Sequence, residues 1–225
     1  MTSEQLLFQF AETTTYSADQ FLIFPGNREA HRWITSADEW PSHALVLTGP
    51  PRSGKTHLTH IWAAAHDAQI VQASRLTQEN VPEFAGGNLA IEGADGISDE
   101  RALFHLYNLV RENGGLLLMT ARLRPAAWNI ELPDLSSRVA ATPQVAIGAL
   151  DHEMAGPLIL KLAADRQLSI SPPVVQYLST WLDRTYAACE DAVTRLDRAA
   201  VREGRKVSRQ LAEQELGLKS GREGS

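Results

Sequence analysis

The octapeptide Gly49–Thr56 constrains the fold of this chain more than any other feature. It reads Gly-Pro-Pro-Arg-Ser-Gly-Lys-Thr and matches G-x-x-x-x-G-K-[ST] at every fixed position. The apolar run Ala44–Thr48 precedes it and a helical pattern, Lys55–Ala65, follows it. A chance match in a glycine-rich turn would not require this order of strand, loop and helix. The sequence therefore predicts a phosphate-binding loop that joins a buried strand to a helix.

Each residue type in the loop has a chemical reason to be there. Gly49 and Gly54 let backbone N–H groups wrap around phosphates, and the following helix N-terminus adds positive potential. Lys55 is expected to reach the β- and γ-phosphates, and the Thr56 hydroxyl to bind Mg²⁺. The expected ligand is ADP or ATP with Mg²⁺. The residues expected to contact it here are Gly49, Pro51, Arg52, Ser53, Gly54, Lys55, Thr56 and His57, although His57 also has a purely structural interpretation.

Apolar runs alternate with helical patterns up to residue 148. The predicted strands are Ala44–Thr48, Ile70–Gln72, Leu89–Glu92, Leu116–Thr120 and Gln144–Ile147, with a second helix over Asp99–Glu112. Strands separated by helices predict an α/β fold, a parallel five-stranded sheet with flanking helices. The pattern then becomes helical only, with the clearest helix over Thr185–Val201. We expect an N-terminal arm (1–15), an α/β nucleotide-binding domain (16–148), a small all-α lid (149–218) and a disordered tail (219–225).

Polar residues at two strand ends are candidates for the same site. Glu92 ends one strand and is expected to hold Mg²⁺ together with Thr56; the alternative is that it only ends the strand. Gly93 stands where many phosphate-hydrolysing relatives carry a second carboxylate, and Asp95, further along, would point elsewhere. Efficient hydrolysis by this chain alone is therefore not expected. Thr120 ends the next strand and is either a sensor of the γ-phosphate or a plain strand-ending residue.

Composition narrows the partners and the compartment. The formal net charge is −6 and the pI about 5.6 over 225 residues, so DNA contact is expected to be weak or indirect at most. The single cysteine, Cys189, fits a reducing compartment. The N-terminus lacks a signal-peptide pattern, and no apolar run is long enough to span a membrane. We expect a cytoplasmic protein without a membrane partner.

Several segments around these motifs resemble the DnaA branch of the AAA+ ATPases. Phe21–Arg28 resembles the segment that frames adenine, and the resemblance implies nucleotide contacts by Leu22, Ile23 and Asn27. The segment 104–109 is similar to the helix before the sensor strand, and 183–199 to the last lid helices. Leu135–Arg138 resembles the arginine-finger box, which implies that Arg138 acts in trans on nucleotide held by a neighbour. An ordinary surface arginine is the alternative.

Within that branch the chain is more similar to the short Hda-like regulators than to the initiators. No helix-turn-helix pattern follows the expected lid. Gln5–Phe10, Gln-Leu-Leu-Phe-Gln-Phe, resembles the hexapeptide by which such regulators dock on the sliding clamp, which implies clamp contacts by Gln5, Leu6, Phe8 and Phe10. An edge strand packed on its own domain is the alternative. The implied partners are the DNA polymerase III sliding clamp (beta subunit), the initiator DnaA and, under nucleotide control, further copies of the chain.

The sequence also departs from the family. Ala187 stands where the lid helix of most relatives carries an arginine, and Arg184 lies nearly one turn earlier. The resemblance implies a nucleotide-bound regulator, with ADP the expected ligand, that stimulates ATP hydrolysis by DnaA through Arg138 and prevents over-initiation. Three alternatives stay open: an active AAA+ ATPase such as a helicase loader, a clamp-tethered adaptor in which nucleotide is only structural, and a compact DNA-binding initiator variant.

Overall fold

A parallel sheet organises the first two thirds of the described chain. The computed structural model describes residues 16–84 and 86–218. The strands are β1 (Ala44–Thr48), β2 (Gln69–Gln72), β3 (Leu89–Glu92), β4 (Leu117–Ala121) and β5 (Gln144–Ala146). They pair in the order β2-β3-β4-β1-β5, and every pairing is parallel. The predicted parallel five-stranded sheet is therefore confirmed, with strand ends shifted by no more than one residue.

Helices cover both faces of the sheet. Successive residues of a strand point to opposite faces, so Leu45 and Leu47 of β1 pack with α1 (Arg28–Thr35) and α2 (Lys55–His66). Ala44 and Val46 pack with α3 (Glu100–Glu112) and α4 (Pro133–Ala141) on the other face. All five residues of β1 are buried. This two-sided burial explains why the strand is a continuous apolar run rather than an alternating one.

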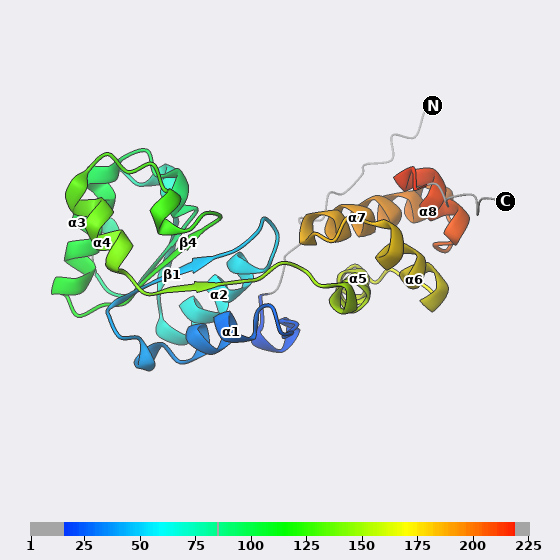
Figure 1. The fold of residues 1–225 in the computed structure, drawn as a ribbon, viewed down its shortest axis with the longest axis horizontal. Helices are drawn as coiled ribbons and strands as arrows, with labels where there is room; N and C mark the ends of the chain where they lie inside the picture. The colour runs from blue at the N-terminus through cyan, green and yellow to red at the C-terminus, as the bar shows by residue number, and fades with distance from the viewer. Residues whose placement is uncertain (1–15, 85, 219–225) are drawn as a thin grey trace, which may run out of the picture.

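Only helices follow β5 in the described chain. They are α5 (His152–Asp165), α6 (Pro172–Trp181), α7 (Tyr186–Glu203) and α8 (Arg209–Leu216). These four helices form a separate group beyond the carboxyl end of β5 (Figure 1). Asp151, Thr185 and Ser208 cap α5, α7 and α8 by accepting backbone N–H bonds. No described helix is long and apolar enough to cross a membrane.

The segment between β5 and α5 contacts the N-terminal turn. The Gly148 N–H donates to the Gly26 carbonyl at 2.7 Å, and the Tyr186 hydroxyl of α7 donates to the Gly148 carbonyl at 3.1 Å. The predicted boundary between residues 148 and 149 falls in this segment; the division into two domains stays a prediction. The predicted arm, with Gln5, Leu6, Phe8 and Phe10, and the tail lie outside the described residues.

Candidate nucleotide-binding site

The loop Gly49–Gly54 joins β1 to α2 in a conformation that needs its glycines. Gly54 has φ +97°, and a Cβ there would lie 3.0 Å from Phe21 Cε2. A Cβ on Gly49 would lie 2.9 Å from Ser53 Oγ and 3.0 Å from Ile147 Cβ. Arg52 also adopts a left-handed backbone, with φ +62°. A loop that folds back tightly at the N-terminus of a helix presents backbone N–H groups suited to an anion.

Lys55 folds back over the loop. Its Nζ donates to the Gly49 and Pro50 carbonyls, both at 2.8 Å. Burial lowers the pKa of Lys55 because it disfavours the charged ammonium, and the nearby Arg122 adds like-charge repulsion. Asp95 and Glu92 oppose this shift by favouring the charged form. The ammonium therefore lies among the residues at the carboxyl ends of the strands.

Two buried oxygens near the loop lack partners. Ser53 is 4% exposed and Glu92 is 8% exposed. Glu92 Oε2 accepts from Gln72 Nε2 at 2.6 Å, but neither Glu92 Oε1 nor Ser53 Oγ has a hydrogen-bond partner among the described residues. Buried polar atoms are normally satisfied, so an unpaired one needs an explanation. The residues present fit a phosphate with its Mg²⁺, because Mg²⁺ is usually held by one or two protein oxygens together with phosphate oxygens.

The neighbouring strand ends bring Thr120 and Gly93 together. The Gly93 N–H donates to Thr120 Oγ1 at 3.4 Å, a long bond between the ends of β3 and β4. Gly93 has φ +70°, a backbone conformation that favours glycine. Asp95 Oδ2 accepts from the N–H groups of Arg122 and Leu123 at 3.0 and 3.2 Å. Its carboxylate thus holds the segment after β4, and it also lies close enough to Lys55 to favour the charged ammonium.

The segment expected to frame adenine is a turn fixed by Asn27. This side chain is 1% exposed, accepts from the Phe24 N–H and donates to the Leu22 carbonyl, both at 2.8 Å. Asn27 therefore shapes the turn through its own hydrogen bonds. Ile23, which precedes the turn, is 47% exposed, so part of its apolar side chain faces solvent.

His57 and Phe21 connect this segment to α2. His57 Nε2 lies 2.8 Å from the Ser17 carbonyl, so Nε2 is the protonated nitrogen. The Phe21 ring packs edge-on against the His57 ring, with centroids 5.2 Å apart, and stacks on His31 at 5.7 Å. The described contacts of His57 are those of a structural residue. The Phe21 ring would lie 3.0 Å from a Cβ on Gly54. The segment 21–28 was selected from the sequence, but Phe21 was not among its expected contact residues.

The helix α7 presents a carboxylate to the loop. Glu190 Oε2 lies 3.7 Å from Arg52 Nη1, and Glu190 Oε1 lies 3.9 Å from Arg166 Nη2. Ala187 lies one turn earlier on α7, while Arg184 precedes the capping residue Thr185 and is exposed. The structure thus places Glu190, rather than a lid arginine, against Arg52 of the loop.

Arg138 is on α4, in contact with aromatic rings of α3. Its guanidinium carbon lies 5.1 Å from the centroid of the Phe104 ring and 6.0 Å from that of Tyr107. A guanidinium stacked on a ring gains a cation–π contact and keeps its N–H donors at the edge. Its charge also acts on His43, just before β1, and none of its described contacts is with the loop.

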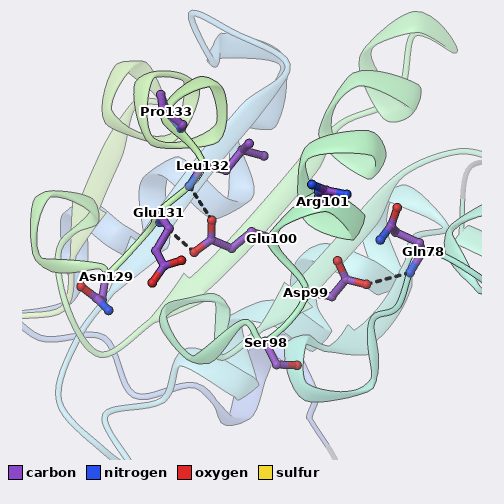
Figure 2. Close-up of a pocket in the computed structure, with 9 residues that line it drawn as sticks. All are labelled: Gln78, Ser98, Asp99, Glu100, Arg101, Asn129, Glu131, Leu132 and Pro133. Carbon is purple, nitrogen blue, oxygen red and sulfur yellow. Dashed lines mark hydrogen bonds between the residues drawn. The ribbon is translucent and has the colours of Figure 1, made fainter.

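A separate cavity of about 750 Å³ lies where α3 and α4 begin (Figure 2). Glu100 accepts from the Glu131 and Leu132 N–H groups at 2.9 and 2.7 Å, and Asp99 accepts from Gln78 and Ala102, both at 3.0 Å. These carboxylates are occupied in holding their own turns. None of the lining residues belongs to the phosphate-binding loop, so this cavity is not the site that the loop defines.

Five residues of this region were not selected individually from the sequence: Phe21, Gln72, Arg122, Arg166 and Glu190. Gln72 and Arg122 follow the same rule as Glu92 and Thr120, since each lies at the carboxyl end of a parallel strand, and that rule could have found them. Glu190 and Arg166 carry no such signal, because their approach to the loop depends on how α5 and α7 pack.

The sheet order and the phosphate-binding loop together give a fold of the P-loop AAA+ type. Within that class the fold resembles DnaA: domain III of the replication initiation protein DnaA of Thermotoga maritima superposes with a TM-score of 0.77 and 17% identity, covering 91% of this chain and 98% of that one. The DnaA of Aquifex aeolicus with bound AMPPCP gives 0.68 and 17%, covering 86% and 68%. The Holliday junction branch migration motor RuvB of Thermotoga maritima gives 0.71 and 16%, covering 91% and 72%.

The sequence of this chain has weaker matches among known proteins than its fold has. No family model matches the chain. An uncharacterised protein of Haemophilus influenzae is 29% identical over 110 residues. The match spans 48% of this chain and 48% of that protein, about half the length of each. These comparisons therefore show that the chain has a DnaA-like AAA+ fold.

Proposed function

We propose that this chain is a nucleotide-binding AAA+ regulator that holds ADP or ATP with Mg²⁺ at Gly49–Thr56. The observation that carries the proposal is a pair of buried oxygens, Ser53 Oγ and Glu92 Oε1, that have no partner in the described part of the chain, together with Lys55 folded over the loop. Phosphate and Mg²⁺ would satisfy both oxygens. The AMPPCP-bound DnaA of similar fold supports the ligand class.

The residues of the site then have distinct roles. The loop N–H groups and Lys55 bind phosphate, and Thr56 and Glu92 hold Mg²⁺. Leu22 and Ile23 contact the base from a turn that Asn27 fixes, and Thr120 is placed to sense the terminal phosphate. The helices of residues 149–218 act as a lid, whose angle to residues 16–148 depends on the bound nucleotide.

The finer proposal concerns a partner. The chain regulates chromosomal replication initiation in the cytoplasm: it docks on the DNA polymerase sliding clamp through Gln5–Phe10 and presents Arg138 to ATP bound by DnaA. An arginine supplied in trans stabilises charge on the transferring phosphoryl group and contributes about 10³–10⁵ in rate in related GTPases. The stacking of Arg138 on Phe104 supports this role, because it orients the guanidinium before a partner arrives. Gly93, at the position where a second carboxylate would be expected, supports the proposal that the chain hydrolyses its own nucleotide slowly.

The decisive experiment measures ATP hydrolysis by DnaA with the clamp loaded on DNA. We expect the unmodified chain to stimulate hydrolysis and Arg138→Ala to return it to the unstimulated rate, while nucleotide binding by the variant is unchanged. Arg195→Ala is the matched control, since Arg195 is an exposed arginine in a helical ion pair with Asp191. A Phe8→Ala variant is expected to lose clamp binding.

Two outcomes would contradict parts of the proposed function. Stimulation by Arg138→Ala equal to that of the unmodified chain would reject the arginine role. Rapid ATP turnover by the chain alone would favour an active AAA+ ATPase instead.

A further inference from the structure

The contact between Arg52 and Glu190 links the phosphate-binding loop to the lid helices. Arg52 Nη1 and Glu190 Oε2 are 3.7 Å apart, across a separation of more than a hundred residues in sequence. The two side chains are 51% and 32% exposed. An ion pair this exposed is weak in water, so a competing anion of higher charge can displace it.

The lid half of the pair is held in place. Arg166, 15% exposed, lies 3.9 Å from the second oxygen of Glu190. Its guanidinium also donates to Thr194 Oγ1 and to the Leu162 carbonyl, both at 3.3 Å. Arg166 is therefore fixed between α5 and α7, and it holds the Glu190 carboxylate on the side of α7 that faces the loop.

The loop half is free to change partner. Arg52 lies between Gly49 and Gly54 and has a left-handed backbone. Its described ion pair is the one with Glu190. Phosphate bound by the loop N–H groups would lie within the same short loop and carry more negative charge than one carboxylate. A guanidinium binds phosphate oxygens through paired N–H donors.

We propose that Glu190 lowers the nucleotide affinity of the loop by competing with the phosphates for Arg52. Nucleotide binding then breaks the ion pair that ties α7 to the loop and frees the lid to take a new angle. The inference rests on the proposed nucleotide binding and adds the residue that couples it to the lid.

The test is a double-mutant cycle with Glu190→Gln and Arg52→Gln, read as the Kd for ADP and for AMPPCP in Mg²⁺. Glu190→Gln is expected to tighten binding about two- to fivefold, the size that an exposed ion pair permits. The same change in the Arg52→Gln background is expected to have no effect, because the competition has been removed. Raising salt from about 0.05 to about 0.5 M should shrink the gain by screening.

Asp191→Asn is the matched control. It removes the same charge from the next residue of α7, whose exposed carboxylate pairs with Arg195 instead of the loop. We expect it to leave the Kd unchanged. Unfolding temperatures of all variants verify that each is folded.

The possible outcomes distinguish failure of the proposed nucleotide binding from failure of the proposed role of Glu190. If the unmodified chain binds no nucleotide, the proposed function and this inference both fail. If it binds, but Glu190→Gln leaves the Kd unchanged, only the inference fails. An equal gain in the Arg52→Gln background, or with Asp191→Asn, would also overturn it, since the effect would then be one of net charge.

Discussion

Glu92 has its two carboxylate oxygens in different situations. One accepts a short bond from Gln72, and the other is buried with no partner in the described chain. Because the proposed Mg²⁺ site would need an anionic oxygen at this point, we expect Glu92→Gln to weaken nucleotide binding in Mg²⁺ by about tenfold, or 1.4 kcal/mol. In EDTA the variant and the unmodified chain should bind alike. Titration with and without Mg²⁺ measures this, and an equal loss in EDTA would rule out the metal role.

Arg138 and Phe104 allow a second prediction at the residue scale. The stacking distance of 5.1 Å predicts a cation–π contact worth about 0.5–1 kcal/mol at a partly exposed site. A double-mutant cycle of Phe104→Leu and Arg138→Ala, read by urea unfolding, should show a coupling of this size. A coupling indistinguishable from zero would mean that Phe104 does not orient Arg138. Phe104→Leu should also reduce stimulation of DnaA less than Arg138→Ala does.

The start of α7 donates a hydrogen bond to the segment that follows β5. The buried Tyr186 hydroxyl donates to the Gly148 carbonyl, and burial raises the pKa of this phenol, which keeps it a donor. Tyr186→Phe keeps the ring and loses the bond, so we expect the free energy of unfolding to fall by about 1 kcal/mol.

Tyr177→Phe is the control for that measurement. Its hydroxyl donates to the carbonyl of Leu218, the last described residue. Water can replace this bond more easily because the neighbouring Gly217 is exposed, so the loss should be smaller. Urea unfolding of both variants gives the comparison, and an equal or larger loss in Tyr177→Phe would contradict the importance of the Gly148 contact.

Elements in this chain were more predictable from sequence than contacts between them. The P-loop, β1 and β3 follow from local patterns: a motif with fixed glycines and apolar runs bounded by polar residues. The cap of α3 by Asp99 is equally local. The contacts Arg52–Glu190 and His57–Ser17 are not, because each joins segments that meet only through tertiary packing. Gln72 and Glu92, in contrast, are register partners at the ends of neighbouring parallel strands. Parallel register predicts which strand ends meet; no comparable rule predicts which residue of α7 faces the loop.

At the scale of the whole molecule, three histidines connect folding to pH. Burial lowers the pKa of His31, His43 and His57 below the ordinary value, because a charged imidazole is disfavoured there. The positive charges of Arg111 and Arg138 lower the pKa of His43 further. For His57, the bond to Ser17 and the Asp165 carboxylate raise the pKa and so oppose the effect of burial. The charges of Lys161 and His60 lower it further.

The direction of the pH effect follows from which state takes up protons. Between the lowered folded pKa and the unfolded pKa of about 6.5, the unfolded chain binds more protons than the folded one. Stability is therefore complete above about pH 6.5 and declines as pH falls below that value. We expect the unfolding temperature to drop from pH 7.5 to 5.5, a range chosen above the titration of ordinary carboxylates, and the drop to be smaller in His57→Gln. If the unfolding temperatures of the two proteins change with pH in parallel, His57 contributes nothing to this dependence. If the unfolding temperature of the unmodified chain rises toward pH 5.5, the direction inferred for all three histidines is wrong.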